Sequence, residues 1–232
     1  MVTVDYFSDV LCIWAYGGQV RLDELERRFG DQVELRYRFI PIFASAKTQI
    51  LKNWEAEGGY EGFNRHLQTV AQAWTHVSCH EKLWLECQPA SSTSAHAVLK
   101  AVLLLEEQGV IDREPHERFE DRTCFEALMW NIRRAFFESA QNISDFKVLE
   151  KLVSEVGIDW QAVFQLIENG EAYAGLHRDD ELKQEYCVKG SPSFVLNEGR
   201  QVLYGNLGYR IIAANVDELL KREDVMDDAS WC

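Results

Sequence analysis

The sequence predicts a mixed α/β fold in which a long, all-helical segment interrupts a small sheet-containing part. The first 43 residues show a strand, helix, strand pattern, and residues from about 44 to 170 show helical periodicity almost throughout. From residue 171 onward the pattern returns to helix, strand, strand, helix. The two ends of the chain therefore provide one sheet together, with the helical segment inserted between them.

The amino-terminal part begins with a predicted strand over residues 2–7, where Val, Val and Tyr alternate with Thr, Asp and Phe. Residues 16–29 place apolar side chains along one side and Arg, Asp and Glu opposite, which predicts an amphipathic helix closed by Gly30. A second alternating run, 33–40, precedes Pro41. A strand, helix, strand unit of this kind implies two parallel strands joined by a right-handed crossover.

The middle of the chain is expected to be almost entirely helical. Residues 44–60, which contain Gly58 and Gly59, carry the weakest pattern, and we expect part of this region to be loop. Stronger periodicity predicts helices over 63–77, 93–108, 121–140, 145–156 and 159–167. The aromatic side chains along the 121–140 helix are interpreted as core rather than as a cofactor site.

The carboxy-terminal part returns to mixed structure. We predict a helix over 171–186, strands over 193–196 and 201–204 joined by a tight turn, and a helix over 210–221. The last residues, 225–232, form an acidic tail that ends at a cysteine with no expected role.

Composition excludes some classes of partner. The 232 residues include 24 Lys plus Arg and 38 Asp plus Glu, for a formal net charge of -14. Such a chain has no net attraction to a polyanion, so we expect no nucleic-acid partner. The pair Arg133-Arg134 is too short to alter this and is interpreted as a solvated helix face. No secretory leader and no apolar run of about 18 residues is evident, so we expect no membrane span and a cytoplasmic location.

Six cysteines occur, at positions 12, 79, 87, 124, 187 and 232, and no two of them have the C-x-x-C spacing of a dithiol or half a zinc site. In a reducing compartment we expect free thiols. A loose cluster, His76, Cys79, His80 and Cys87, does not match a familiar zinc pattern, so no metal site is predicted.

The stretch Ser8–Tyr16, which contains Cys12, is the strongest candidate for chemistry. It links the first predicted strand to the first predicted helix. A cysteine in such a turn lies near N–H groups that have no partner inside the helix, and their partial positive charge favours thiolate over thiol. We therefore expect a lowered pKa at Cys12. The alternative is a small, buried, inert side chain, as most free cysteines are.

A second stretch supports the interpretation of the Cys12 stretch as an active site. It reads Val188-Lys189-Gly190-Ser191-Pro192-Ser193-Phe194. A proline at the start of a strand suits an edge position or a cis peptide bond. Here the sequence resembles the DsbA-like branch of the thioredoxin superfamily, in which a G-x-P-[ST]-F segment carries a cis-proline facing the active-site cysteine. The resemblance implies a thioredoxin fold with a large inserted helical domain, formed by residues 1–43 and 171–224 around residues 44–170. It also implies that Pro192 is the cis-proline and that Ser191 precedes it.

The same resemblance places the active site at Cys12-Ile13-Trp14-Ala15, where the branch has Cys-Pro-Trp-Cys. Ala15 stands where a dithiol enzyme has its resolving cysteine, so no exchange within the motif can release a mixed disulfide from Cys12. Cys187, just before the proline loop, is the one other cysteine with a fold-level argument for proximity, and it is a candidate resolving thiol.

The chain is also similar to FrnE-like polyketide-associated oxidoreductases, kappa-class glutathione transferases and 2-hydroxychromene-2-carboxylate isomerases. These relatives leave three functions open. The first is a monothiol oxidoreductase in which Cys12 attacks a disulfide or an electrophile and glutathione is the cosubstrate. The second is an isomerase or transferase in which glutathione supplies the thiol. The third is a peptide-binding or chaperone-like module that does no chemistry.

In each case the expected substrate contacts are Ile13, Trp14, Ala15, Ser191 and Pro192. The substrate is expected to be a small molecule or a peptide, and no bound cofactor is expected beyond glutathione as cosubstrate. The resemblance also makes a homodimer possible.

Overall fold

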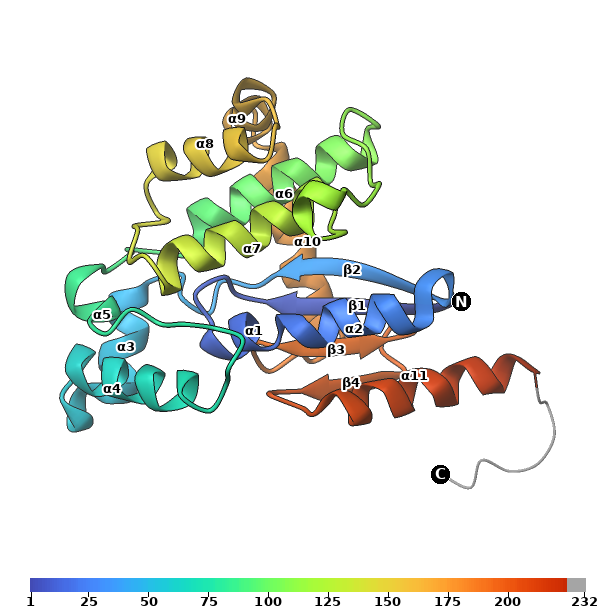
Figure 1. The fold of residues 1–232 in the computed structure, drawn as a ribbon, viewed down its shortest axis with the longest axis horizontal. Helices are drawn as coiled ribbons and strands as arrows, with labels where there is room; N and C mark the ends of the chain where they lie inside the picture. Colours follow the sequence, from blue (N-terminus) through green and yellow to red (C-terminus); the bar gives the residue numbers. More distant parts are fainter. Residues whose placement is uncertain (225–232) are drawn as a thin grey trace.

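A computed structural model describes residues 1–224, so the expected acidic tail with Cys232 lies outside the described residues. Four strands form one sheet in the order β2-β1-β3-β4 (Figure 1). These are β1 Val2–Ser8, β2 Val33–Phe39, β3 Ser193–Leu196 and β4 Gln201–Tyr204. Strand β1 pairs in parallel with β2 and antiparallel with β3, and β3 pairs antiparallel with β4. The two ends of the chain therefore build the sheet jointly, as predicted.

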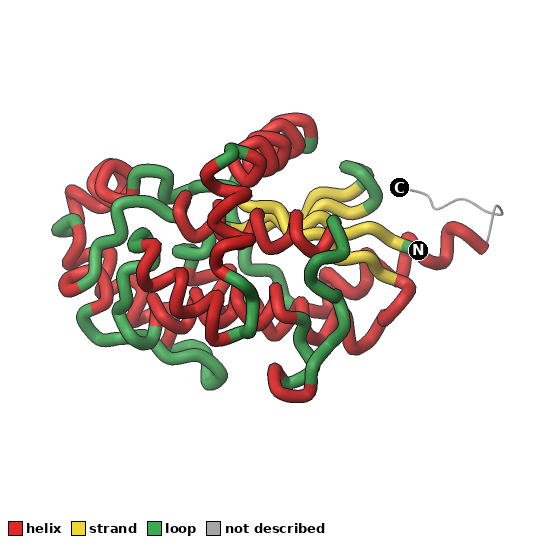
Figure 2. Tube along the Cα trace, turned by 90° about the horizontal axis from the view of Figure 1, so that it is seen from above, coloured by secondary structure: helices red, strands yellow, loops and turns green. Residues whose placement is uncertain are grey.

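Helices cover both faces of this sheet. Helices α2 (Gln19–Phe29) and α11 (Tyr209–Asp224) lie on one face, and α10 (Glu171–Glu185) lies on the other (Figures 1 and 2). Helix α1 (Ile13–Gly17) follows β1 directly and stands at the end of the sheet. This is a thioredoxin-like arrangement, and it places the start of α1 beside the loop that leads into β3.

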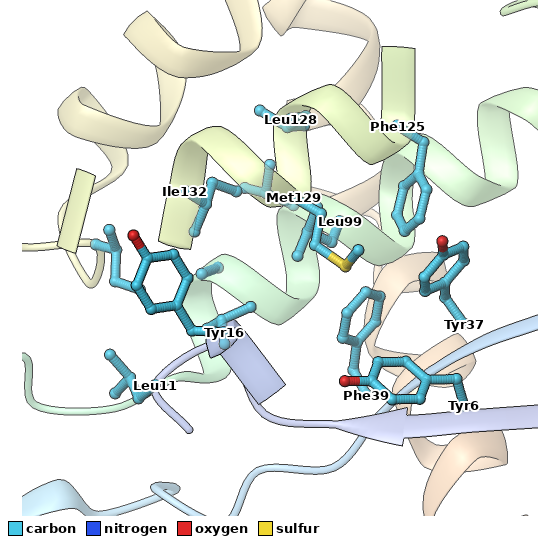
Figure 3. Packing of buried hydrophobic residues seen from close by; sticks show 14 of the residues in the cluster. Tyr6, Leu11, Tyr16, Tyr37, Phe39, Leu99, Phe125, Leu128, Met129 and Ile132 are labelled. Carbon is cyan, nitrogen blue, oxygen red and sulfur yellow. The ribbon is translucent and has the colours of Figure 1, made fainter. Parts of the chain in front are cut away.

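The other α-helices of the described residues lie in the segment between β2 and α10. They are α3 (Ala46–Trp54), α4 (Tyr60–Ala71), α5 (Leu83–Glu86), α6 (Thr93–Glu107), α7 (Cys124–Phe137), α8 (Phe146–Glu155) and α9 (Trp160–Glu168). This segment is the predicted helical insertion. Its core is continuous with that of the sheet, since Tyr6 and Phe39 belong to the same buried cluster as Phe125 and Met129 of α7 (Figure 3). The division into domains at residues 43 and 170 stays a prediction.

The structure differs from the predicted elements near the first helix. The single helix expected over 16–29 begins earlier, at Ile13, and is broken at Gly18 into α1 and α2. The ring of Trp74 packs against Gly17, next to this break, and an added Cβ at Gly17 would meet its Cζ3 at 2.2 Å, so the close packing requires glycine there. The helix expected over 63–77 runs over Tyr60–Ala71, and Trp74 lies in the non-helical segment that follows it.

Two further differences concern the start of the helical segment. The region 44–60, expected to be partly loop, contains α3 and a 3-10 turn, Glu55–Glu57, before the glycine pair. The four-residue helix α5 was not predicted, because its length is below what a periodic pattern can show. No helix within residues 1–224 is both long and apolar enough to cross a membrane.

A buried ionic network ties the helical segment to the sheet. Lys100 of α6 places its Nζ 2.7 Å from Oδ2 of Asp179 on α10. The same oxygen accepts a hydrogen bond from the backbone N–H of Phe39 on β2, at 2.9 Å. Arg38 lies 3.7 Å from the other Asp179 oxygen and donates to Asp5 on β1 at 2.7 Å. Each buried charge in this network has an opposite partner.

Candidate functional site

Cys12 is the N-cap residue of α1 and follows β1 by four residues. Only 8% of its surface is exposed. Its Sγ lies 3.3 Å from the carbonyl oxygen of Ser191, the residue before Pro192, and donates a hydrogen bond to it. The Ser191–Pro192 peptide bond is cis. The two stretches singled out in the sequence therefore meet in space, with the sulfur against the backbone of the proline loop.

The pKa of Cys12 corrects one expectation. Burial is the largest influence on the Cys12 thiol and raises its pKa above the ordinary value, and the nearby Asp9 carboxylate raises it further. The hydrogen bond with Ser191 and the backbone N–H groups of Ala15 and Trp14 lower the pKa, and the contribution of the N–H groups is the effect expected at a helix start. The expected low pKa is therefore wrong for the enclosed site: the neutral thiol is favoured, and it donates to Ser191.

Asp9 joins four separate segments around Cys12. Its Oδ1 accepts the backbone N–H of Leu11 at 2.8 Å, and its Oδ2 accepts from the Phe43 N–H at 2.9 Å and the Ser92 hydroxyl at 2.8 Å. Its own N–H donates to Oγ of Ser191 at 2.9 Å. This carboxylate is fully buried, and the donors satisfy both of its oxygens. Asp9 thus fixes the Cys12 loop against the proline loop and the start of α6.

The three residues after Cys12 lie in different surroundings. Ala15 is completely buried, Ile13 is 5% exposed, and Trp14 is half-buried. The Trp14 ring packs edge-on against Trp74 at a centroid distance of 5.6 Å and against His66 at 6.3 Å. Trp14 therefore packs against aromatic rings of the helical segment. Contact of Ile13, Trp14, Ala15, Ser191 or Pro192 with a substrate stays a prediction.

Cys187 lies directly after the C-cap residue of α10 and is exposed. Its φ of 52° places it in the left-handed region that favours glycine. The sulfur of Cys12 contacts Ser191 rather than another thiol, and the five cysteines within the described residues are all free. A resolving role for Cys187 stays a prediction. Within residues 1–224, no group of three or more His, Cys, Asp or Glu side chains is arranged to hold a metal ion.

Two residues next to the site were missed or misread from the sequence. No role was predicted for Asp9, although a carboxylate between apolar residues 7 and 10–11 indicates a buried acceptor. Arg133 was interpreted as part of a solvated face, and this was wrong: its neighbour Arg134 is exposed and pairs with Glu138, but Arg133 is fully buried. Its spacing of four residues from buried Met129 could have indicated the buried face.

These features define a thioredoxin-fold protein with one cysteine at the start of its first helix, set against a cis-proline loop. A family model described as a DSBA-like thioredoxin domain matches residues 3–216, and the chain therefore belongs to that family. It is a family of thiol oxidoreductases, and the type of activity in this chain is left open by the match. No curated protein sequence matches the chain.

Several solved structures share the fold. A probable DsbA oxidoreductase from Streptomyces coelicolor has a TM-score of 0.72 at 19% identity, over 100% of this chain and 95% of the other. The cytosolic disulfide reductase DsbM from Pseudomonas aeruginosa with GSH has a TM-score of 0.64 at 19% identity, over 96% and 100%. A 2-hydroxychromene-2-carboxylate isomerase also has 0.64, at 15% identity, over 97% and 100%. At such identities these likenesses show the fold alone.

Proposed function

We propose that this chain is a monothiol oxidoreductase in which Cys12 is the reacting sulfur and glutathione is the cosubstrate. The observation that carries the proposal is the position of Sγ, at the start of α1 and 3.3 Å from the carbonyl of Ser191, with Ala15 three residues on. A thiol at this place meets any extended chain that lies along the proline loop. Without a second cysteine in the motif, the resolving thiol comes from outside it.

The reaction has two exchange steps. The Cys12 thiolate attacks the glutathione sulfur of a mixed disulfide, forms a Cys12–glutathione disulfide and releases the substrate thiolate, which takes a proton from water. A second glutathione thiolate then attacks that same glutathione sulfur and restores the Cys12 thiolate, with oxidised glutathione as product. In net terms the mixed disulfide and one free glutathione give the substrate thiol and oxidised glutathione. One disulfide is consumed and one is formed, so the substrate sulfur is reduced while the sulfur of the second glutathione is oxidised.

The raised pKa of Cys12 adds a condition to this mechanism. In the enclosed site the thiol is protonated at neutral pH and donates to Ser191. Deprotonation takes place in the substrate complex, where the hydrogen bond with Ser191 and the N–H groups of Ala15 and Trp14 lower the pKa of the Cys12 thiol.

The experiment follows glutathione-dependent reduction of the mixed disulfide of glutathione and 2-mercaptoethanol. We expect Cys12→Ser to reduce the rate to the uncatalysed level, because serine cannot form the disulfide. Cys187→Ser changes an exposed cysteine and is the matched control, expected to keep the native rate. In the native chain, mass spectrometry is expected to find one glutathione on Cys12. Activity that survives Cys12→Ser contradicts the proposal, and activity lost in Cys187→Ser replaces it with a two-cysteine mechanism.

One observation favours a second candidate, a glutathione-dependent isomerase or transferase. A buried, protonated Cys12 is suited to donate a hydrogen bond to the thiolate of bound glutathione. In that role Cys12→Ser keeps a donor at the same place and retains activity. The Cys12→Ser variant thus separates the two candidates, and a failure of the native chain to bind glutathione favours a peptide-binding module instead.

We also propose a cytoplasmic location for this reaction. Five free cysteines among the described residues fit a reducing compartment, and the structurally similar DsbM from Pseudomonas aeruginosa is described as cytosolic and was solved with GSH. A homodimer stays a prediction, to be checked by light scattering.

A further inference from the structure

A fully buried guanidinium lies behind the active-site segment. Arg133 of α7 is among the largest side chains that have no solvent exposure. Its Nη1 donates to Oε1 of Gln19 at 2.7 Å, and its Nη2 donates to Oγ of Ser8 at 3.2 Å. Both acceptors are neutral, and Nε has no hydrogen-bond partner among the described residues. Within that part of the chain no carboxylate forms an ion pair with Arg133.

Such an arrangement is unfavourable by itself. Arginine stays protonated in proteins, and a buried charge without a counter-charge costs several kcal/mol. The position lies on the face of α7 that otherwise carries Met129, Ile132 and Phe136, all completely buried. An apolar residue would fill this place without the electrostatic cost. The charge itself therefore requires an explanation beyond packing.

The two hydrogen bonds show where the charge acts. Ser8 is the last residue of β1 and Gln19 the first of α2, so Arg133 holds both ends of the ten-residue segment that carries Cys12. Tyr6 of β1 is influenced by the charges of both Arg133 and Cys12, the first lowering and the second raising its pKa. On the other side, His96 of α6 is influenced by Arg133 and by Asp9. Arg133 and Cys12 therefore belong to one buried electrostatic environment.

In the described part of the chain, Arg133 is the cation of this buried environment that has no ion-pair partner, and the Asp9 carboxylate is an anion in the same environment. Burial lowers the pKa of His96 to about 4, so His96 is neutral, and burial raises that of Tyr6 to about 12, so Tyr6 is neutral too. Asp9 is buried next to Cys12. The remaining neighbours with charge are Arg21 on α2, which acts on Tyr6, and Lys100 on α6, which is already paired with Asp179.

We propose that Arg133 is a positioning residue through which the helical insertion supplies the buried counter-charge of the Cys12 thiolate. This inference rests on the reactive Cys12 of the proposed function. When Cys12 loses its proton to solvent, a second negative charge forms beside Asp9. The guanidinium behind β1 offsets that charge, while its hydrogen bonds to Ser8 and Gln19 keep the segment in place. The catalytic sulfur and its electrostatic support thus come from the two different parts of the chain.

The test measures the rate of Cys12 alkylation by iodoacetamide from pH 6 to 11, read by mass spectrometry, in variants at position 133. Arg133→Met fills similar volume without charge, and Arg133→Gln keeps hydrogen-bond donors without charge. The half-rate pH is the pH at which the alkylation rate of Cys12 reaches half of its maximum. Both variants are expected to raise the half-rate pH by about one unit, which lowers the rate about tenfold at any pH below the native half-rate pH. Arg133→Lys keeps the charge and is expected to stay within about half a unit of the native chain.

Two controls separate charge from structure. Arg27→Met removes an exposed arginine on α2 and is expected to leave the half-rate pH unchanged. Ser8→Ala removes one hydrogen bond of the guanidinium but not its charge, and is expected to lower the melting temperature without moving the half-rate pH. If Arg133 had a structural role alone, its variants would have lower melting temperatures than the native chain but the same half-rate pH.

Native-like half-rate pH values in folded Arg133→Met and Arg133→Gln overturn the proposal. If neither neutral variant folds, Arg133→Lys decides alone, and a rise of one unit or more in that variant overturns it. The readout needs no glutathione. A chain that shows the expected shifts but no glutathione-dependent activity contradicts the proposed function and leaves the role of Arg133 standing.

Discussion

Two buried cations reach from the helical segment to the sheet, Lys100 on α6 and Arg133 on α7, and they are compensated differently. Lys100 contacts Asp179 at 2.7 Å, and Asp179 also accepts the N–H of Phe39. Arg133 has only the neutral oxygens of Ser8 and Gln19 as hydrogen-bond acceptors in the described part of the chain.

We call the Lys100–Asp179 pair the joint, because it links α6 to α10 and, through Phe39, to β2. Its role differs from that of Arg133, which lies beside the proposed active site. The Lys100 pair lies between α6, α10 and β2, away from the sulfur, and its charges cancel locally. Arg133 lies at the ends of the segment that carries Cys12, where a charge that is not cancelled can act on a titrating thiol. Among the described residues, Lys100 is paired with Asp179, whereas Arg133 has no ion-pair partner and lies at the ends of the segment where chemistry is proposed.

The largest expected effect comes from breaking the joint. Lys100→Met leaves Asp179 buried without its closest cation, and removal of one partner of a buried pair costs about 3 kcal/mol in unfolding free energy. Urea denaturation at pH 7 measures this. The double variant Lys100→Met/Asp179→Asn keeps an acceptor for Phe39 and is expected to recover part of the loss. A double variant as unstable as the sum of its singles contradicts the joint.

A third link between the two parts of the chain uses a shared proton instead of a cation. Glu26 of α2 hydrogen-bonds to Glu126 of α7, which also accepts from the Tyr37 hydroxyl at 3.0 Å. Burial and the neighbouring Glu126 charge raise the pKa of Glu26 to about 9. Glu26 is therefore protonated in the folded chain at neutral pH and donates to Glu126, so this link depends on pH.

The raised pKa of Glu26 determines whether this link stabilises the folded chain more at low pH or at high pH. The full contribution of Glu26 is present below its ordinary pKa of 4.5, and it falls as pH rises toward about 9, where the folded state also loses the proton. The fall is about 1.4 kcal/mol per pH unit within this range. We expect Glu26→Gln, which keeps a donor, to remove this slope in urea denaturation at pH 5 to 9 and to be more stable than the native chain at pH 8. Asp31→Asn, at an exposed carboxylate, is the charge control; an equal slope in native and Glu26→Gln chains contradicts the protonated link.

The smallest effect tests how closely the joint is packed. A Cβ at Gly175 of α10 would lie 2.8 Å from Cγ and 2.9 Å from Cδ of Lys100. Gly175→Ala is therefore expected to lose about 1 kcal/mol of unfolding free energy through displacement of Lys100. In a Lys100→Ala background the clash is absent, and the same change is expected to stabilise through the helix propensity of alanine. A stabilising Gly175→Ala in the native background contradicts this packing.

Much of the fold followed from local sequence patterns. Strands β3 and β4 and most helices are where periodicity, Gly and Asp signals predict them. Cys12 and Pro192 could be found because each lies in a short motif that a resemblance supports. The close packing of Trp74 on Gly17 could not be predicted, because the two residues are more than 50 positions apart in the sequence.

The electrostatics of the site were the least predictable part. A helix start lowers a cysteine pKa by a local effect, which a sequence can show. Burial of Cys12 is produced by distant segments, and this stronger effect reversed the direction. The burial of Arg133 could not be predicted for the same reason. Two adjacent arginines look alike in the sequence, and only tertiary packing buries one of them.

The contacts of Asp9 have a consequence for the order in which the molecule folds. Asp9 meets Phe43, Ser92 and Ser191 at sequence separations of 34, 83 and 182 residues. Contacts this distant require closure of long loops and form slowly compared with local ones. During synthesis Cys12 emerges 179 residues before Ser191, so the sulfur lacks this contact until Ser191 has been made. Protection of Cys12 from alkylation therefore marks the completion of folding, because it requires both ends of the chain to have met.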